Sequence, residues 1–307
     1  MAVNVISVNQ FDKKALNDLF VKTLDFKKKY QTKEGREGLL KLQSGKQMCS
    51  FFFEASTRTR VSFELAAQRI GMGVVSTADA SISSVKKGET LEDTITLLSN
   101  YGFDVIVMRH NETGAAARAV KVSKVPLING GDGKGEHPTQ ALLDMYTIWE
   151  KFGRLDNLII SIGGDLANGR TARSLAKILS KYSGNKIYFV SSKELRIGDD
   201  IKEVLRQSGT EFEETENMNE ALSKSDVIYW TRIQKERMEN PDAVGDRYII
   251  DEETLKIIPK DAIIMHPLPR VDEITVGVDS DPRAYYFIQA ANGLYLRMAL
   301  IDTILSE

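Results

Sequence analysis

Short apolar segments alternate with helical patterns along nearly the whole chain, and this alternation restricts the possible folds more than any other feature of the sequence. Such alternation is typical of βαβ units, in which parallel strands form a sheet and the connecting helices cover its faces. The alternation runs through the first half of the chain and then starts again. We therefore predict an α/β fold with two doubly wound domains, each with a mostly parallel central sheet, linked by interdomain helices.

The expected strands are short and apolar: Met48–Phe53, Val105–Met108, Val125–Ile128, Leu158–Ile162, Lys186–Val190, Val227–Trp230 and Ala262–Met265. The expected helices carry apolar residues at helical spacing: Val61–Ile70, Leu91–Tyr101, Ala115–Val122, Pro138–Lys151, Thr171–Tyr182, Ile201–Gln207 and Gln289–Leu305. The seam between the domains should lie near Pro138–Asn157. We expect one domain of residues 1–138 plus 288–307 and another of residues 139–287.

Composition and charge argue against several functional classes for this chain. The formal net charge of −2 gives no global attraction to nucleic acid or to an anionic membrane. The single cysteine, Cys49, has apolar neighbours, which predicts a buried and unreactive thiol. We find no secretory signal pattern, and no apolar run approaches the roughly 20 residues of a membrane-spanning helix. The simplest setting is a reducing cytoplasm.

Polar residues gather where strands of the first domain end. Ser56–Arg60 follows the first strand and opens the next helix, where free backbone N–H groups, hydroxyls and planar guanidinium groups suit a phosphate. Arg109 and His137 leave neighbouring strand ends on the same rim. Each alone is compatible with a helix cap, a surface arginine or a turn. The polar segment Ser81–Gly88 is either an ordinary surface loop or a lid that brings a cation to an anionic substrate.

The second domain shows a similar arrangement. Arg170 begins a helix after the loop Gly163–Gly169, and Thr231–Gln234 follows another strand, so two arginines suit a substrate with two carboxylates. Exposed loop arginines are the alternative. The glycine loop also admits a dinucleotide site, although it does not match the GxGxxG fingerprint. His266–Arg270 forms a stiff loop in which the Leu268–Pro269 bond could be cis.

Taken together and in this order, three motifs resemble those of the transcarbamoylase family: Ser56–Arg60, His137–Gln140 and His266–Arg270. The resemblance extends from about Phe11 to Leu305. Two further segments, Ser83–Thr90 and Thr231–Arg237, resemble the aspartate-specific branch of the family. The ornithine branch typically has Cys in place of Pro267.

The resemblance implies a binding site for carbamoyl phosphate in the first domain. Ser56, Thr57, Arg58 and Thr59 would bind the phosphate, and Arg109 would span the phosphate and carbonyl oxygens. The carbonyl would be polarised by Thr59, Arg109 and His137, which with Arg58 form the implied catalytic set. The carbamoyl amino group would be held by Gln140 and by the main-chain carbonyls of Pro267 and Leu268.

The resemblance also implies an aspartate site in the second domain. Arg170 and Arg232 would bind the two carboxylates, and the remaining implied contacts are Thr171, Gln234 and Lys87. Ser83 and Lys87 would come from a neighbouring subunit, because the family works as a homotrimer with shared sites. Some members join separate zinc-binding regulatory chains.

The implied reaction is carbamoyl transfer to L-aspartate, an early committed step of de novo pyrimidine biosynthesis. We expect no metal or organic cofactor, no nucleic acid and no membrane partner. Three alternatives remain at this point. They are a transcarbamoylase for ornithine or an acylated ornithine, a nucleotide-binding oxidoreductase built on Gly163–Gly169, and a non-catalytic scaffold on the same fold.

Overall fold

The computed structural model describes residues 4–77, 87–133, 135–233 and 248–306. The chain divides into two compact units, the first formed by Met1–Tyr146 with Ala291–Glu307 and the second by Thr147–Ala290. The chain passes from one unit to the other within helix α6 (Pro138–Phe152) and again within helix α10 (Tyr286–Leu305). Each unit has its own parallel sheet with helices on its faces, which confirms the predicted fold class.

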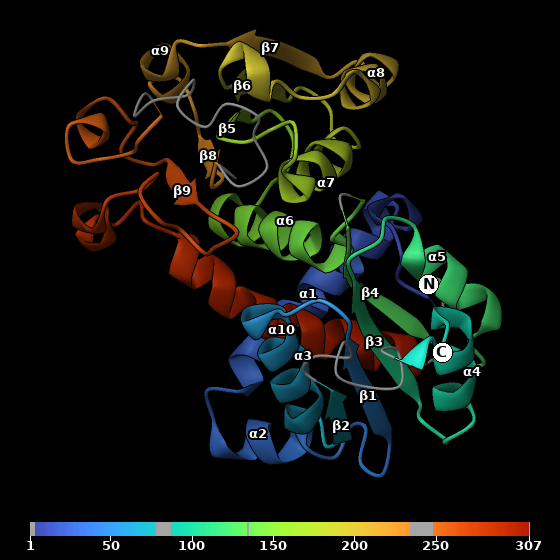
Figure 1. Ribbon diagram of the computed structural model, residues 1–307. Helices are drawn as coiled ribbons and strands as arrows, with labels where there is room; N and C mark the ends of the chain where they lie inside the picture. Colours follow the sequence, from blue (N-terminus) through green and yellow to red (C-terminus); the bar gives the residue numbers. More distant parts are fainter. Residues whose placement is uncertain (1–3, 78–86, 134, 234–247, 307) are drawn as a thin grey trace. The chain divides into compact units, whose positions relative to one another are not determined.

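The sheet of the first unit has four parallel strands in the order β2-β1-β3-β4. The strands are β1 (Gln47–Phe52), β2 (Gly73–Thr77), β3 (Val105–His110) and β4 (Leu127–Asp132). β3 lies between β1 and β4, with Met48 opposite Val105 and Ile106 opposite Leu127. The carboxyl ends of β1, β3 and β4 therefore lie side by side at one edge of the sheet, as they do in Figure 1.

Alternating residues of these strands bury the two faces of the sheet. The helices of the unit are α1 (Lys13–Lys29), α2 (Lys33–Leu39), α3 (Thr57–Arg69), α4 (Leu91–Ser99) and α5 (Ala115–Val122), with the first part of α6 and the last part of α10. Cys49 and Phe51 pack in one cluster with Ile95 of α4 and Ala116 of α5. The intervening Ser50 faces α3, where its hydroxyl donates to Glu64 at 3.1 Å.

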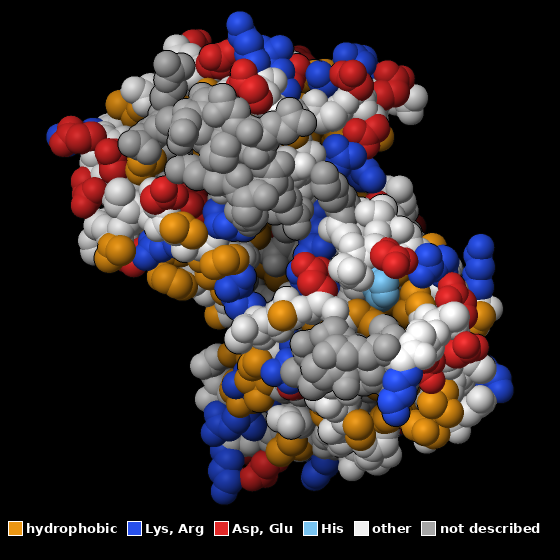
Figure 2. Space-filling view, in the orientation of Figure 1, with side chains coloured by type: hydrophobic (Ala, Val, Ile, Leu, Met, Phe, Trp, Pro, Cys, Tyr) orange, Lys and Arg blue, Asp and Glu red, His pale blue; other side chains and the backbone are white. Residues whose placement is uncertain are grey.

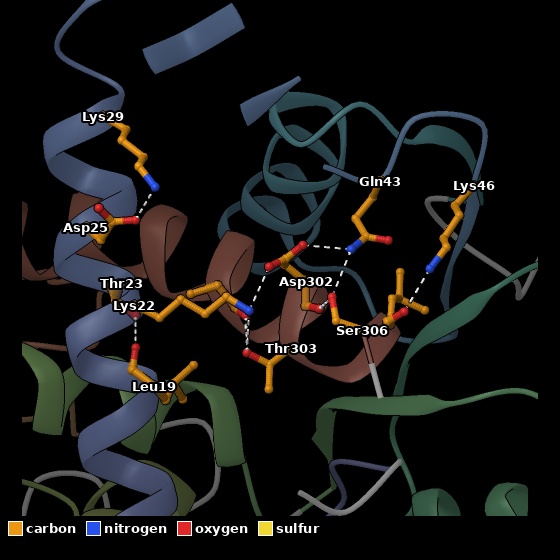
Figure 3. A network of polar contacts seen from close by, with 12 residues as sticks. Leu19, Lys22, Thr23, Asp25, Lys29, Gln43, Lys46, Asp302, Thr303 and Ser306 are labelled. Carbon is orange, nitrogen blue, oxygen red and sulfur yellow. Dashed lines mark hydrogen bonds and ion pairs between the residues drawn. The ribbon is translucent and has the colours of Figure 1, made fainter. Parts of the chain in front are cut away.

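The end of α10 is joined to the beginning of the chain by a polar network (Figure 3). Asp302 is 6% exposed and pairs with Lys22 of α1 at 2.6 Å. The Gln43 amide donates to the other oxygen of Asp302, also at 2.6 Å, and Lys46 donates to the main-chain oxygen of Leu305 at 2.8 Å. Residues more than 250 positions apart in sequence thereby close the first unit.

The sheet of the second unit has five parallel strands in the order β7-β6-β5-β8-β9. The strands are β5 (Ile159–Gly163), β6 (Lys186–Val190), β7 (Glu211–Thr215), β8 (Val227–Trp230) and β9 (Ile263–Met265). Helices α7 (Arg170–Leu179) and α8 (Asp199–Ser208) pack together, and α9 (Met218–Leu222) contacts β6. Trp230 is fully buried on the α9 side, and its indole N–H donates to the main-chain oxygen of Tyr248 at 2.8 Å.

The structure differs from the sequence-based expectation in several elements. Strands β2 and β7 were not predicted, because these edge strands are only half-buried and lack a continuous apolar run. β4 extends to Asp132, four residues beyond the expected end of this strand at Ile128. Gly130 fits in the strand because a side chain there would approach the Met108 main-chain oxygen at 3.1 Å. Helix α3 begins at Thr57, four residues before the expected start.

Two smaller predictions are confirmed. The Leu268–Pro269 peptide bond is cis. Cys49 is 2% exposed, and burial raises the pKa of its thiol to about 12, so the thiolate form is strongly disfavoured. Among the helices of the described residues, none has the length and hydropathy needed to cross a lipid bilayer.

Charged side chains on the surface are mixed in sign. In Figure 2, Lys and Arg side chains around α8 and α9 lie among Asp and Glu side chains. The net charge of −2 agrees with this mixture. Sites for anions therefore have to arise from local groups of cations, and two such groups occur at strand ends.

Candidate active site

The turn from β1 into α3 presents an unused helix N-terminus. Ser56 is the N-cap residue in an extended conformation (φ −157°), and its hydroxyl makes no capping hydrogen bond. The backbone N–H groups of the first helical turn have no partner within the helix and carry the positive end of the helix dipole. Thr57 and Arg58 are exposed at this turn. The segment therefore has the groups that bind a phosphate at a helix N-terminus.

Thr59 connects this turn to the end of β4. Its hydroxyl lies 3.3 Å from Nε2 of His137, and the two residues are 7% and 4% exposed. The main-chain oxygen of His137 accepts the first hydrogen bonds of α6, from Gln140 and Ala141 at 3.0 and 3.2 Å. The imidazole is consequently held at the carboxyl edge of the sheet next to α3.

Arg109 lies between these two segments. It is the next-to-last residue of β3, pairs in register with Phe52 of β1, and is 9% exposed. Its Nη2 lies 3.2 Å from Glu54 Oε1, and its Nη1 donates to the Gly130 oxygen at 3.3 Å. Buried Nε of Arg109 has no hydrogen-bond partner among the described residues. Sequence reasoning missed Glu54, whose only signal was its position directly after the expected strand.

Two arginines of this group repel each other. Partial desolvation and then the charge of Arg109 lower the pKa of Arg58. A like charge nearby disfavours the charged form of Arg58, and a bound anion would relieve the repulsion. The helix N-terminus, the two guanidinium groups and the Thr59–His137 contact thus form one rim in the first unit whose chemistry suits an anion.

The second unit places its arginines after adjacent strands. Thr231 donates both its backbone N–H and its hydroxyl to the Gly163 oxygen at 2.9 Å, which joins the ends of β5 and β8. Gly164 (φ +99°) follows, and a side chain there would meet the Thr231 oxygen at 2.0 Å. Arg232 comes directly after this junction, and Arg170 is the first residue of α7; both are half-buried.

The loop after β9 is fixed by a buried histidine. His266 Nδ1 accepts the Leu268 backbone N–H at 2.8 Å, and its Nε2 lies 2.7 Å from Glu273, so the Nε2 proton belongs between the ring and the carboxylate. Burial is the largest single effect on Glu273 and opposes ionisation, but the hydrogen bonds from His266 and from backbone N–H groups, together with the electrostatic attraction of His266, outweigh it, and the pKa of Glu273 is lowered. The described residues donate no hydrogen bond to the main-chain oxygens of Pro267 or Leu268.

The remaining predicted residues of the aspartate site and of the neighbouring-subunit contact are placed as follows. Ser83 and most of Ser81–Gly88 lie outside the described residues, as does Gln234 with the rest of Thr231–Arg237 beyond Ile233. Lys87 is described and exposed. Thr171 is half-buried in the first turn of α7, next to Arg170.

Two family models match nearly the whole chain. The carbamoyl-phosphate-binding domain of aspartate/ornithine carbamoyltransferases matches residues 4–150, and the aspartate/ornithine-binding domain of the same enzymes matches residues 156–304.

The chain belongs to the aspartate/ornithine carbamoyltransferase family.

Relatives within this carbamoyltransferase family are similar over nearly all of this chain. The chloroplastic aspartate carbamoyltransferase of Oryza sativa subsp. japonica is 50% identical, over 98% of this chain and 85% of the relative. The aspartate carbamoyltransferase catalytic subunit of Clostridium novyi is 44% identical, over 98% of this chain and 97% of the relative.

Solved structures agree with this family assignment. The catalytic subunit of M. jannaschii aspartate transcarbamoylase superposes with a TM-score of 0.92 at 42% identity, covering 99% of this chain and 98% of that one. Aspartate transcarbamoylase from Trypanosoma cruzi in complex with carbamoyl phosphate and aspartate superposes with a TM-score of 0.90 at 38% identity, covering 98% and 96%.

Proposed function

We propose that this chain is an aspartate carbamoyltransferase, which converts carbamoyl phosphate and L-aspartate to N-carbamoyl-L-aspartate and phosphate. The observation that carries the proposal is the rim of the first unit, where Arg58 and the buried Arg109 lie beside a helix N-terminus and the buried Thr59–His137 contact. Family membership and the names of the relatives support the choice of substrates.

Carbamoyl phosphate binds at this rim. Ser56, Thr57, Arg58 and Thr59 bind its phosphate, where helix N–H groups, hydroxyls and a guanidinium act together. Arg109 spans the phosphate and the carbonyl oxygen. The oxygen of the Gln140 side chain accepts a hydrogen bond from the carbamoyl amino group, and the main-chain oxygens of Pro267 and Leu268, to which the described residues donate no hydrogen bond, are further acceptors. In this proposal residues 1–138 with 288–307 are the carbamoyl phosphate-binding domain.

L-Aspartate binds through the second group of cations. Arg170 begins α7 and Arg232 follows β8, so a guanidinium is available for each carboxylate of the substrate. Thr171, Gln234 and Lys87 complete the aspartate set. Ornithine carries a cationic side chain, which Arg232 would repel. Residues 139–287 are accordingly the aspartate-binding domain.

The reaction begins when the α-amino nitrogen of aspartate attacks the carbamoyl carbon. The new C–N bond produces a tetrahedral oxyanion, which Arg109, His137 and Thr59 stabilise as preorganised donors. The C–O bond to phosphate then breaks, and the departing phosphate takes the amine proton. Positioning two anionic reactants supplies a further large part of the rate. No metal or organic cofactor takes part in this scheme.

The proposal extends to the assembly, the pathway and the cellular location of the enzyme. The chain forms a homotrimer in which Ser83 and Lys87 reach the site of a neighbouring subunit. The trimer can also bind separate zinc-binding regulatory chains. Its product enters pyrimidine (UMP) biosynthesis. We place it in the cytoplasm, although the rice relative is named a chloroplastic enzyme.

A product assay tests the function directly. The purified chain is mixed with carbamoyl phosphate and either L-aspartate or L-ornithine, and the carbamoylated product is measured. We expect product with aspartate only. Product with ornithine only would keep the phosphate rim but overturn the roles of Arg232 and Gln234. Absence of product with either amine, from a folded trimer, would favour the scaffold alternative.

The aspartate site has its own test in the variant Arg232→Ala. The variant lacks the guanidinium that binds one of the two carboxylates of aspartate. We expect the KM for aspartate to rise by about 10-fold or more, with a smaller change in the KM for carbamoyl phosphate. Steady-state kinetics with each substrate varied in turn measures both constants. An unchanged aspartate KM would remove Arg232 from the site.

A further inference from the structure

A buried histidine and a buried glutamate hold the loop that follows β9. His266 is 2% exposed and Glu273 is 3% exposed, and Oε1 of the carboxylate lies 2.7 Å from Nε2 of the imidazole. The other carboxylate oxygen accepts the backbone N–H of Val271 at 3.2 Å. The backbone N–H of His266 donates to the side-chain oxygen of Gln289 at 2.8 Å, and Gln289 is also buried. The imidazole is therefore fixed through its main chain and through its Nε2 atom.

The contacts of the imidazole decide which of its nitrogens carries the proton. Nδ1 accepts the backbone N–H of Leu268 at 2.8 Å, so this nitrogen has no proton of its own. An imidazole with one acceptor nitrogen donates through the other, and the proton on Nε2 is donated to Glu273. Hydrogen bonds in such a chain polarise one another. Glu273 therefore makes Nδ1 a better acceptor for the Leu268 N–H.

The hydrogen bond to Nδ1 orients the peptide group between Pro267 and Leu268. This peptide is trans, and the N–H and C=O groups of a trans peptide point in opposite directions. Because the N–H points at the imidazole, the main-chain oxygen of Pro267 points away from it. Leu268 has a φ of +51°, in the left-handed region that is unfavourable for residues with a side chain. Such a conformation persists only where its surroundings hold it, and the bond to His266 is one such restraint.

We propose that His266 and Glu273 are positioning residues that aim the Pro267 oxygen at the carbamoyl amino group, so that the site selects an acyl phosphate bearing NH2 over one bearing CH3. The inference rests on the proposed function, because that function assigns the amino group to this oxygen. It adds the part of the chain that directs the acceptor. A methyl group has no proton to donate, so an acetyl group leaves the desolvated oxygen without a partner.

Equilibrium binding to the purified chain tests the inference without turnover. Dissociation constants are measured for carbamoyl phosphate, acetyl phosphate and inorganic phosphate. The variants His266→Leu and His266→Asn are compared, each combined with Glu273→Met so that no buried carboxylate is left without its partner. Leucine and asparagine have nearly the same shape, but only the asparagine oxygen can accept the Leu268 N–H. The two double variants therefore differ in this acceptor and share the other losses.

The preference for carbamoyl phosphate over acetyl phosphate should fall about 10-fold with leucine and stay within about 3-fold of wild type with asparagine. Binding of inorganic phosphate should not change in either double variant. A matched control is Asp281→Asn, which alters a carboxylate of the same unit that accepts hydrogen bonds from Arg283. It should leave the preference unchanged. Equal preferences in the two double variants, or an equal fall in the control, would overturn the proposal.

Nuclear magnetic resonance of the wild-type chain decides if a double variant does not fold. The chain has three histidines, so isotopic labelling of the His and Leu nitrogens gives a simple spectrum. We expect an unprotonated Nδ1 of His266 coupled to the Leu268 amide nitrogen. Carbamoyl phosphate should shift both signals more than acetyl phosphate does, because a peptide oxygen that accepts a hydrogen bond polarises its own N–H. A protonated Nδ1, or equal shifts, would contradict the proposal. Failure of wild type to form N-carbamoyl-aspartate would instead count against the proposed function.

Discussion

Arg109 shows how a single residue can be functional without being exposed. A buried guanidinium needs compensation, and Glu54 and the Gly130 oxygen supply part of it. Its Nε has no partner among the described residues, and its charge disfavours the charged form of Arg58. Both observations indicate a side chain held ready for an anion rather than one used for stability.

The first prediction concerns this residue. Arg109→Ala removes a preorganised donor from the tetrahedral intermediate, so kcat should fall by about 10²- to 10³-fold. Steady-state kinetics of N-carbamoyl-aspartate formation measures the loss. Arg206→Ala serves as the control, because Arg206 is an exposed residue of α8 whose ion pair with Glu203, at 3.4 Å, lies on the surface. A wild-type kcat in Arg109→Ala would exclude the proposed role.

At the scale of elements, α10 contributes to the first unit through its last turns. Asp302 joins this helix to Lys22 of α1 and to Gln43, as Figure 3 shows. Removing one partner of a buried charge pair leaves an uncompensated group. The second prediction is that Asp302→Asn lowers the free energy of unfolding by about 1–3 kcal/mol.

Urea denaturation of the purified variant measures this change. Asp18→Asn is the matched control, because Asp18 pairs with Lys14 on the exposed surface of α1, where ion pairs contribute little. Equal stability of Asp302→Asn and wild type would show that the network does not hold α10 in place.

In the second unit, a bidentate ion pair holds the segment before α10. Arg283 donates to both oxygens of Asp281 at 2.7 Å and to the Leu255 and Ile258 main-chain oxygens at 2.9 and 2.6 Å. The hydrogen bonds from Arg283 lower the pKa of Asp281 below its ordinary value of 3.8. The folded state therefore binds the proton less tightly than the unfolded state does.

The third prediction follows from the sign of this shift. A lowered folded-state pKa contributes stability that is present above pH 3.8 and is lost as the pH falls through the folded value. Asp281→Asn should therefore lower the unfolding free energy near neutral pH, and the difference from wild type should shrink in acid. Denaturation across a pH series measures it. A difference that persists at full size in acid would contradict the assignment.

At the scale of the whole molecule, the proposed trimer shares residues between chains. Lys87 is exposed. The fourth prediction is that Lys87→Ala and Arg109→Ala chains, each weakly active, regain activity when mixed and reassembled. With random exchange around a closed ring, about a quarter of the sites combine native residues from two neighbours.

Activity of the reassembled mixture measures this sharing. Lys87→Ala chains that are dissociated and reassembled with further chains of the same variant give the baseline activity. Activity no higher than the mean of the two separate variants would show that each site uses residues of one chain only.

The sequence by itself determined the fold class and the place of the polar groups along the chain. Apolar runs such as Lys186–Val190 and Val227–Trp230 match the observed strands at both ends, because buried strands need continuous apolar residues. Parallel strands bring their carboxyl ends to one edge, so Arg109 and His137 could be expected on the same rim. The edge strands β2 and β7 were missed because half-buried strands lack that signal.

Only the tertiary structure decided which buried polar groups meet. Glu54 meets Arg109 and Glu273 meets His266 through charge and hydrogen bonding, which no periodicity in the sequence reports. Patterns in a sequence report short-range preferences and the direction of burial. The partner of a buried charge is set by how helices and strands pack, because desolvated groups are stable only where a complementary group lies within contact distance.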